Sequence, residues 1–231
     1  KMHLLINKKK IYLYLLIFLT LSTLVNINYS KNLQEFFNLK YIVIDGLRHE
    51  YQKKLKEDLN LFKNKNILFI SAHELSDILE KYNEFESYKI QKIFPFKLKV
   101  EIKETEYIAK TIINGKEFLV GKNKKFIELK NFSLDQHVPV IFGNFPIDSF
   151  MNLQENLKKN NFDLEIINNY FYFKSNRWDL EIENNITIKL PKTNQFESLK
   201  KYQLLKNENK IKENSIIDFR VPKTVIISND K

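Results

Sequence analysis

The chain has 231 residues, of which 43% are hydrophobic and 29% charged, a balance that supports folded cores and excludes a disordered protein. Its formal net charge of +10 suits an anionic partner, either a nucleic acid or a phospholipid surface. The lysines are spread along the whole chain without an RNA-binding aromatic box or an Arg-Gly-Gly repeat, so nucleic acid is not expected as a partner.

A long apolar segment lies near the start of the sequence. Residues 11–29 are almost uninterrupted apolar sequence, directly preceded by the lysines at 8–10. As a helix, this segment would extend about 28 Å, close to a hydrocarbon core of about 30 Å. The basic flank predicts residues 1–10 as a cytoplasmic tail, 11–29 as a transmembrane helix and 30–38 as a linker, with the rest of the chain in the periplasm. A cleaved signal peptide is the alternative, although the Asn-Ile-Asn-Tyr-Ser sequence at 26–30 is a poor cleavage site.

Residues 39–106 are expected to follow the order strand, helix, helix, strand, strand. The first strand ends at the turn signal Asp45-Gly46, and residues 48–62 then repeat apolar positions at helical spacing. Ser71 and Glu74 form a capping-box pattern for the second helix. The sequence KLKVEIKE (97–104) alternates lysine or glutamate with apolar residues, which is typical of a strand with one buried face.

Residues 107–231 have a different pattern, that of a mostly antiparallel β domain with flanking helices. The expected elements are a hairpin at Asn114-Gly115, a helix at 148–160, a strand meander at 162–190 with a turn at Asn184-Asn185, a helix capped by Asn194, and strands at 216–219 and 224–228. The predicted fold class is therefore α+β, with a single N-terminal transmembrane helix, a β-α-α-β-β domain and a C-terminal β domain.

No catalytic or ligand-binding pattern is recognisable. The absence of cysteine excludes disulfides, thiol catalysis and cysteine-ligated zinc. The histidines are not spaced for a metal, and no phosphate-binding or nucleophile motif occurs. Glu181 and Glu183 share one strand face, which we interpret as solvated. Trp178 is expected to pack at a core edge, the alternative being an exposed anchor for a partner. We expect no enzyme activity, no cofactor and no metal.

The elements and motifs together resemble the FtsQ/DivIB family of bacterial cell-division proteins. Four stretches carry the resemblance over the length of the chain, and the first is YIVIDGLRHEYQKKLKEDL (41–59). The positions that match in the other three are Pro95, Leu98, Val100, Ile102, Glu104 and Ala109; then Trp178, Leu180, Ile182, Ile186, Ile188, Leu190 and Pro191; and finally Ile217, Asp218, Phe219, Arg220, Pro222, Val225 and Ile227. Tyr107, Lys124 and Asn185 depart from the family pattern at turn or linker positions.

The resemblance implies a POTRA domain at 39–106 and an FtsQ-type β domain at 107–231. It implies a divisome scaffold at the division septum of the inner membrane, single-pass and type II, that binds FtsB- and FtsL-like proteins near its last strands. FtsK-, FtsW- and FtsI-like proteins are further candidate partners, besides the membrane. The alternatives are a POTRA-containing envelope-assembly or secretion component, and a membrane-tethered cell-wall hydrolase.

The last strand is the predicted partner-binding site. A strand at the edge of a sheet exposes backbone N–H and C=O groups to which a partner can add a further strand. In the alternative interpretation these residues only complete the domain's own sheet. The predicted edge residues are Val221, Lys223, Thr224, Val225, Ile226, Ile227 and Ser228.

Overall fold

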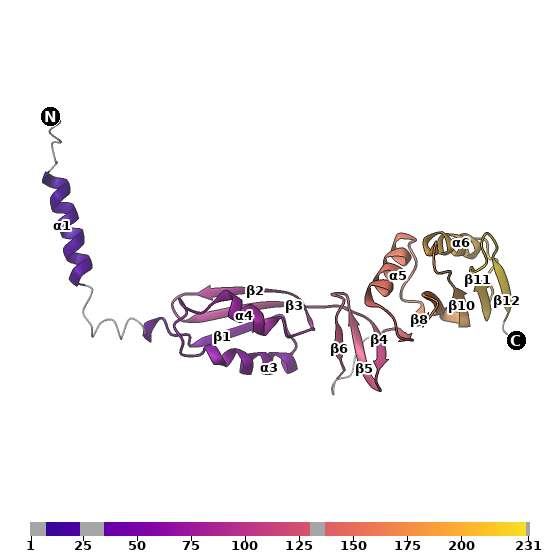
Figure 1. Cartoon of the computed structure of the whole chain (residues 1–231), viewed down its shortest axis with the longest axis horizontal. Coiled ribbons are helices and arrows are strands. Elements are labelled where there is room, and N and C mark those ends of the chain that lie inside the picture. Colours follow the sequence, from indigo (N-terminus) through magenta and orange to yellow (C-terminus); the bar gives the residue numbers. More distant parts are fainter. Residues whose placement is uncertain (1–7, 24–34, 130–136, 230–231) are drawn as a thin grey trace, which may run out of the picture. The chain divides into compact units, whose positions relative to one another are not determined.

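The computed structural model describes residues 8–23, 35–129 and 137–229 (Figure 1). It divides into two compact units, Lys1–Glu104 and Thr105–Lys231, whereas the sequence predicts the domain boundary at 106/107. Residues 1–7 of the predicted tail and 30–34 of the predicted linker lie outside the described residues.

Helix α1 (Lys8–Thr23) occupies part of the predicted transmembrane segment. It has 16 residues and includes three lysines, so that only its portion from Ile11 onward is apolar, about 20 Å of helix. Towards its end the hydroxyls of Thr20 and Ser22 donate hydrogen bonds to backbone carbonyls one turn earlier. Within 8–23, 35–129 and 137–229, no helix has the length and apolar character needed to cross a bilayer. The predicted transmembrane helix over 11–29 is therefore wrong; its residues 24–29 lie outside the described part.

From residue 41 onward, the first unit combines a three-stranded sheet with the helices α3 and α4, in the predicted element order (Figure 1). The elements are β1 (Tyr41–Asp45), α3 (His49–Leu59), the short 3₁₀ helix η1 (Asn60–Phe62), α4 (Ala72–Leu79), β2 (Phe85–Ile93) and β3 (Lys97–Glu104). In the sheet order β1-β3-β2, β1 is parallel to the central β3 and β2 is antiparallel to it. Parallel strands need a long connection, and the two helices lie within it.

The pattern of β3 positions this unit's core. Leu98, Val100 and Ile102 are buried, as their alternation predicts, and they join the buried helix residues in one cluster. The hydroxyl of Ser71 caps α4 by accepting a hydrogen bond from the backbone N–H of His73. Gly46 has φ +81°, and a Cβ there would lie 2.1 Å from the carbonyl oxygen of Ile102, so the turn after β1 requires glycine.

The second unit contains a nine-stranded sheet. Its strands are β4 (Tyr107–Ile113), β5 (Lys116–Gly121), β6 (Phe126–Glu128), β7 (Val140–Phe142), β8 (Ile167–Phe173), β9 (Arg177–Ile182), β10 (Ile186–Lys189), β11 (Ser215–Asp218) and β12 (Ile226–Asn229). The order across the sheet is β12-β11-β10-β9-β8-β7-β4-β5-β6. The predicted turns hold: Asn114 and Gly115 join β4 to β5, and Asn184 and Asn185 lie between β9 and β10, all four at positive φ.

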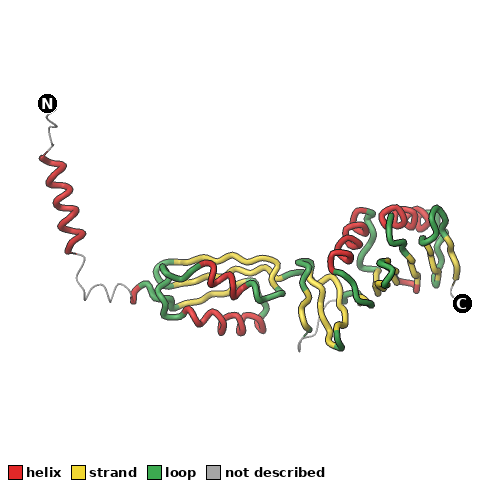
Figure 2. The backbone as a smooth tube through the Cα atoms, viewed as in Figure 1, coloured by secondary structure: helices red, strands yellow, loops and turns green. Residues whose placement is uncertain are grey.

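Each of the two helices of this unit connects a pair of parallel strands. The sequence prediction of a mostly antiparallel domain did not include these crossover connections. Helix α5 (Ile147–Lys159) lies between the parallel strands β7 and β8, and α6 (Gln195–Asn207) lies between the parallel strands β10 and β11. Figure 2 shows both helices along the same face of this sheet. Asn194 precedes α6 in a left-handed conformation and its side chain caps no backbone group, so the predicted N-cap contact is absent.

Trp178 lies at the centre of the second unit's core. Its side chain is fully buried, and its ring contacts those of Phe145, Phe150 and Tyr172. The indole N–H donates to the hydroxyl of Ser149 on α5, at 3.0 Å. This tryptophan therefore fixes α5 to the sheet and is not an exposed anchor.

Candidate partner-binding edge

Strand β12 is the edge of the nine-stranded sheet. It pairs antiparallel with β11, and no other described strand lies on its second side. The strand begins at Ile226, later than the predicted 224, because the chain first turns through Lys223 at φ 64° and the N–H of Thr224 bonds to the carbonyl of Val221. The backbone row on the second side of β12 is therefore open within residues 8–23, 35–129 and 137–229.

The register places two different rows of side chains across the last four strands. On the core face, Leu180, Ile188 and Ile217 are fully buried neighbours, and this row continues to Ile227. Ile227 is 40% exposed because it ends the row at the open edge. A further strand beside β12 would cover this side chain, and burial of apolar surface would favour its addition.

The opposite face carries charges in the same register. Asp179, Lys189 and Asp218 are successive cross-strand neighbours, with alternating sign, and the row continues to Ile226. Ile226 is 46% exposed. Neighbouring opposite charges stabilise a sheet face, whereas like charges directly opposite destabilise it. On this face, a strand added beside β12 would therefore lie next to Ile226, and the charged side chains of Asp218, Lys189 and Asp179 would follow on the strands beyond it.

The remaining predicted edge residues do not all belong to the strand. Val225 is half buried and packs against the core, and Ser228 is exposed opposite Ile216. Val221, Lys223 and Thr224 instead line a pocket of about 590 Å³ between the turn before β12, the end of β10 and the start of α6. The structure thus separates the predicted residues into a strand and a pocket wall.

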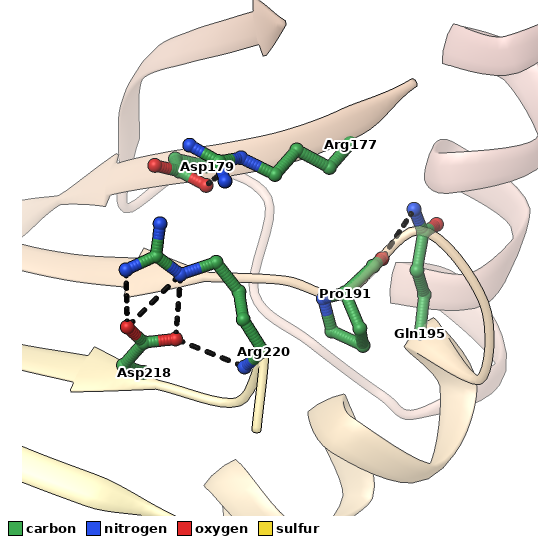
Figure 3. Close-up of polar contacts among 6 residues, drawn as sticks. All are labelled: Arg177, Asp179, Pro191, Gln195, Asp218 and Arg220. Atoms are coloured by element: carbon green, nitrogen blue, oxygen red, sulfur yellow. Dashed lines mark hydrogen bonds and ion pairs between the residues drawn. The ribbon is translucent and has the colours of Figure 1, made fainter. Parts of the chain in front are cut away.

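The pocket is predominantly cationic. Its charged lining residues are Arg177, Lys192, Lys201, Arg220, Lys223 and the single carboxylate Glu197. The side chain of Gln195 bonds to the carbonyl of Pro191 and closes the loop that precedes α6 (Figure 3). Because the cations outnumber the carboxylate and the helix begins here, the pocket favours an anionic side chain.

Arg220 is held in place by Asp218. Its Nε donates to both carboxylate oxygens, at 2.8 and 2.9 Å, a terminal guanidinium nitrogen contacts the same group, and its backbone N–H bonds to Oδ1 (Figure 3). These hydrogen bonds hold the pKa of the Asp218 carboxyl below its usual value. The guanidinium is consequently fixed at the pocket by a contact within the chain itself.

Arg177 and Asp179 form a weaker pair on β9. Arg177 Nε lies 4.0 Å from Asp179 Oδ1, and neither atom has a hydrogen-bond partner among the described residues (Figure 3). Burial raises the pKa of the Asp179 carboxyl, although Arg177, Arg220 and Lys189 partly oppose this. The guanidinium of Arg177 also stacks over the ring of Phe173, at 4.4 Å.

Replacing Asp179 by asparagine is expected to raise the free energy of unfolding near neutral pH. A raised pKa means that the ionised carboxylate destabilises the folded state above that pKa, and the uncharged amide removes this cost. As the pH falls through the raised pKa of the folded state toward the pKa of about 3.9 in the unfolded state, the wild-type carboxyl becomes protonated. The gain in free energy of unfolding that D179N gives over the wild type then declines. Urea denaturation of both proteins between pH 4 and 7 measures the difference; an advantage that grows on acidification would contradict this assignment.

The pocket arginines were not among the predicted site residues. The sequence offered a signal, because only Arg48, Arg177 and Arg220 interrupt an otherwise lysine-only set of cations. Arginine is the residue that holds a carboxylate through a rigid fork of donors, and Arg177-x-Asp179 and Asp218-x-Arg220 are spaced to share a strand face. His73 is an exposed first-turn residue of α4, and its ring pairs with the carboxylate of Asp77 at 2.9 Å.

Residues 37–105 match the family model described as "POTRA domain, FtsQ-type". No curated protein matches the chain. Among solved structures, the major extracytoplasmic domain of the trans isomer of the bacterial cell-division protein DivIB from Geobacillus stearothermophilus has a TM-score of 0.32 and 15% identity, covering 48% of this chain and 99% of that one. Residues 37–105 therefore form an FtsQ-type POTRA domain, close to the POTRA domain that the resemblance to the FtsQ/DivIB family of cell-division proteins implied for 39–106.

Proposed function

We propose that the chain is a non-enzymatic divisome scaffold that binds an FtsB- or FtsL-like protein by strand addition at β12. The proposal places this binding outside the cytoplasm at the division septum, with the POTRA domain (39–106) and the β domain (107–231) acting as separate modules. The observation that carries it is the open edge of β12, which pairs only with β11 among the described residues.

The cross-strand register of β12 indicates which side chains a partner strand would carry at successive positions. Main-chain hydrogen bonds along Ile226–Asn229 give affinity that is independent of side chains. Beside Ile227, the partner would place an apolar residue that extends the buried row of Leu180, Ile188 and Ile217. Because successive side chains of a strand point to opposite faces, the neighbouring partner residue faces Ile226 on the charged side.

The pocket supplies the second contact. A partner segment that continues past the start of β12 would reach Val221, Lys223 and Thr224, which line the pocket. Arg220 is fixed there by Asp218, so little side-chain freedom is lost when an anionic group binds. We infer that the partner carries Asp or Glu beside the strand-forming segment.

The turn before β12 limits pairing by unrelated strands. Pro222 has no backbone N–H to donate, and Lys223 is an exposed cation at positive φ. Proline and lysine are the residues that proteins use to protect sheet edges. The open part of the edge is thus restricted to the short strand Ile226–Asn229.

A fluorescent fusion in dividing cells tests the role. The full chain is expected to form a midcell band. A variant ending at Val225, which lacks β12, is expected to reach midcell through its intact POTRA domain but to retain less than about a tenth of the FtsB-like partner in pull-down. The substitution Ile112→Ser, at an exposed side chain of β4, is the control and should bind the partner normally. A uniform envelope signal for the full chain would favour the secretion alternative instead.

A further inference from the structure

The exposed large hydrophobic side chains of the POTRA domain are gathered at one end. Within residues 35–104, every such side chain belongs to the segments 36–41, 61–69 and 93–94. They are Phe36, Tyr41, Leu61, Leu68, Phe69, Ile93 and Phe94, and we refer to them together as the apolar tip. A scattered set of exposed hydrophobics needs no explanation, but a set confined to one end does.

Backbone hydrogen bonds hold these segments side by side. The N–H of Leu39 bonds to the carbonyl of Lys65, and the N–H of Ile67 bonds to that of Phe37. The N–H of Lys40 bonds to the carbonyl of Phe96 in the turn between β2 and β3. Figure 2 shows these connections as loops at the end of the three-stranded sheet where β1 begins. The apolar tip is therefore one surface.

The exposure of the apolar tip is unusually high. Phe69 is 83% exposed and Leu61 is 70% exposed, although each lies next to a buried neighbour, Ile70 and Phe62. The loop thus turns one hydrophobic residue inward and leaves the adjacent one outside. Burial of such side chains against another molecule would lower the free energy of the system.

The charge around the apolar tip is mostly positive, although the exposed Glu35 directly precedes Phe36. Residues 36–41, 60–70 and 92–97 contain Lys40, Lys63, Lys65, Lys92 and Lys97 and no Asp or Glu. None of the five lysines forms an ion pair with a carboxylate in the described part of the chain. The ammonium groups of Lys40 and Lys65 lie over the rings of Phe96 and Phe62, at 5.3 and 5.0 Å from the ring centres, and both lysines are exposed.

We propose that the apolar tip is a lipid-binding surface that inserts its rings into the headgroup region of an anionic membrane while the lysines contact phosphate groups. Aromatic and leucine side chains bordered by lysines are typical of surfaces that lie in a membrane interface. A protein partner is disfavoured, because the cores of protein interfaces are depleted in lysine. This inference does not depend on strand addition at β12, which involves the other unit.

Single-cysteine labelling of the full chain tests the proposal, since the chain has no cysteine of its own. An environment-sensitive fluorophore at Leu68→Cys should shift to shorter wavelength when phosphatidylglycerol–phosphatidylethanolamine vesicles are added. The matched control is Ser87→Cys, an isosteric change at an exposed position near the opposite end of β2, and its label should not respond. Phosphatidylcholine vesicles should give a much smaller response at Leu68.

The lysines provide a second readout. In the L68C background, replacing Lys63 and Lys65 by glutamine should raise the concentration of anionic vesicles at half-maximal shift by about 30-fold, from the contribution of roughly 1 kcal/mol that each basic residue makes near such a surface. Equal responses at positions 68 and 87, equal responses to both lipids, or no response to vesicles would overturn the proposal. A response only to a protein partner would also overturn it and would assign the tip to that protein.

Discussion

A proline at Ile226 or at Ile227 is expected to abolish capture of an FtsB-like partner, and only one of the two should leave the chain's own sheet intact. Successive N–H groups of a strand point to opposite sides, so one of these adjacent positions donates toward β11 and the other toward the open edge. Proline removes the donor and its ring blocks the approach of a neighbouring strand. We expect at least a tenfold loss of affinity for the outward-facing position, about 1.4 kcal/mol or more.

Strand addition is tested by comparing the Ile226→Pro and Ile227→Pro variants. Affinity is measured with the purified partner segment, and the integrity of β11 and β12 is followed by amide exchange in the free protein. Serine at the same positions is the control, because it keeps the N–H and changes only the side chain. If both proline variants bind the partner as the wild type does, strand addition at β12 is wrong.

Replacing Trp178 by alanine is expected to destabilise the second unit by about 3–5 kcal/mol. The side chain is fully buried among Phe145, Phe150 and Tyr172, and its loss also leaves the hydroxyl of Ser149 without its donor. For a unit of this size the melting temperature should fall by roughly 10 °C or more in calorimetry.

The same experiment tests the independence of the units. The core of the first unit contains no residue beyond Ile102, so amide exchange in β1, β2 and β3 should be unchanged in W178A. Leu204→Ala, at an exposed side chain of α6, is the matched control and should cost less than about 1 kcal/mol. Accelerated exchange throughout both units would contradict separate cores.

The POTRA elements were predictable because their signals are local. The alternation in β3, the helical spacing in α3 and the cap at Ser71 each involve residues close in sequence, and the structure retains all three. The transmembrane prediction relied on apolar character alone, whereas the described helix α1 includes the lysines at 8–10 and lacks the apolar length needed to cross a bilayer.

The order of the nine strands was less accessible. A meander and two strands separated by a helix give similar local patterns, and nothing local indicates that α5 and α6 join parallel neighbours. The last strand was predicted from its β-branched residues, but the pocket beside it was not. Arg177 and Arg220 are far apart in sequence, and only the pairing of β9, β10 and β11 brings them to one surface.

Hydrogen–deuterium exchange of the full chain, with and without a segment of the proposed FtsB-like partner, tests the central claim most directly. We predict that the outward-facing amides of Ile226–Asn229 become protected, while those of β6, at the other edge of the same sheet, exchange as before. Saturating partner with unchanged exchange along Ile226–Asn229, and new protection elsewhere, would contradict the account.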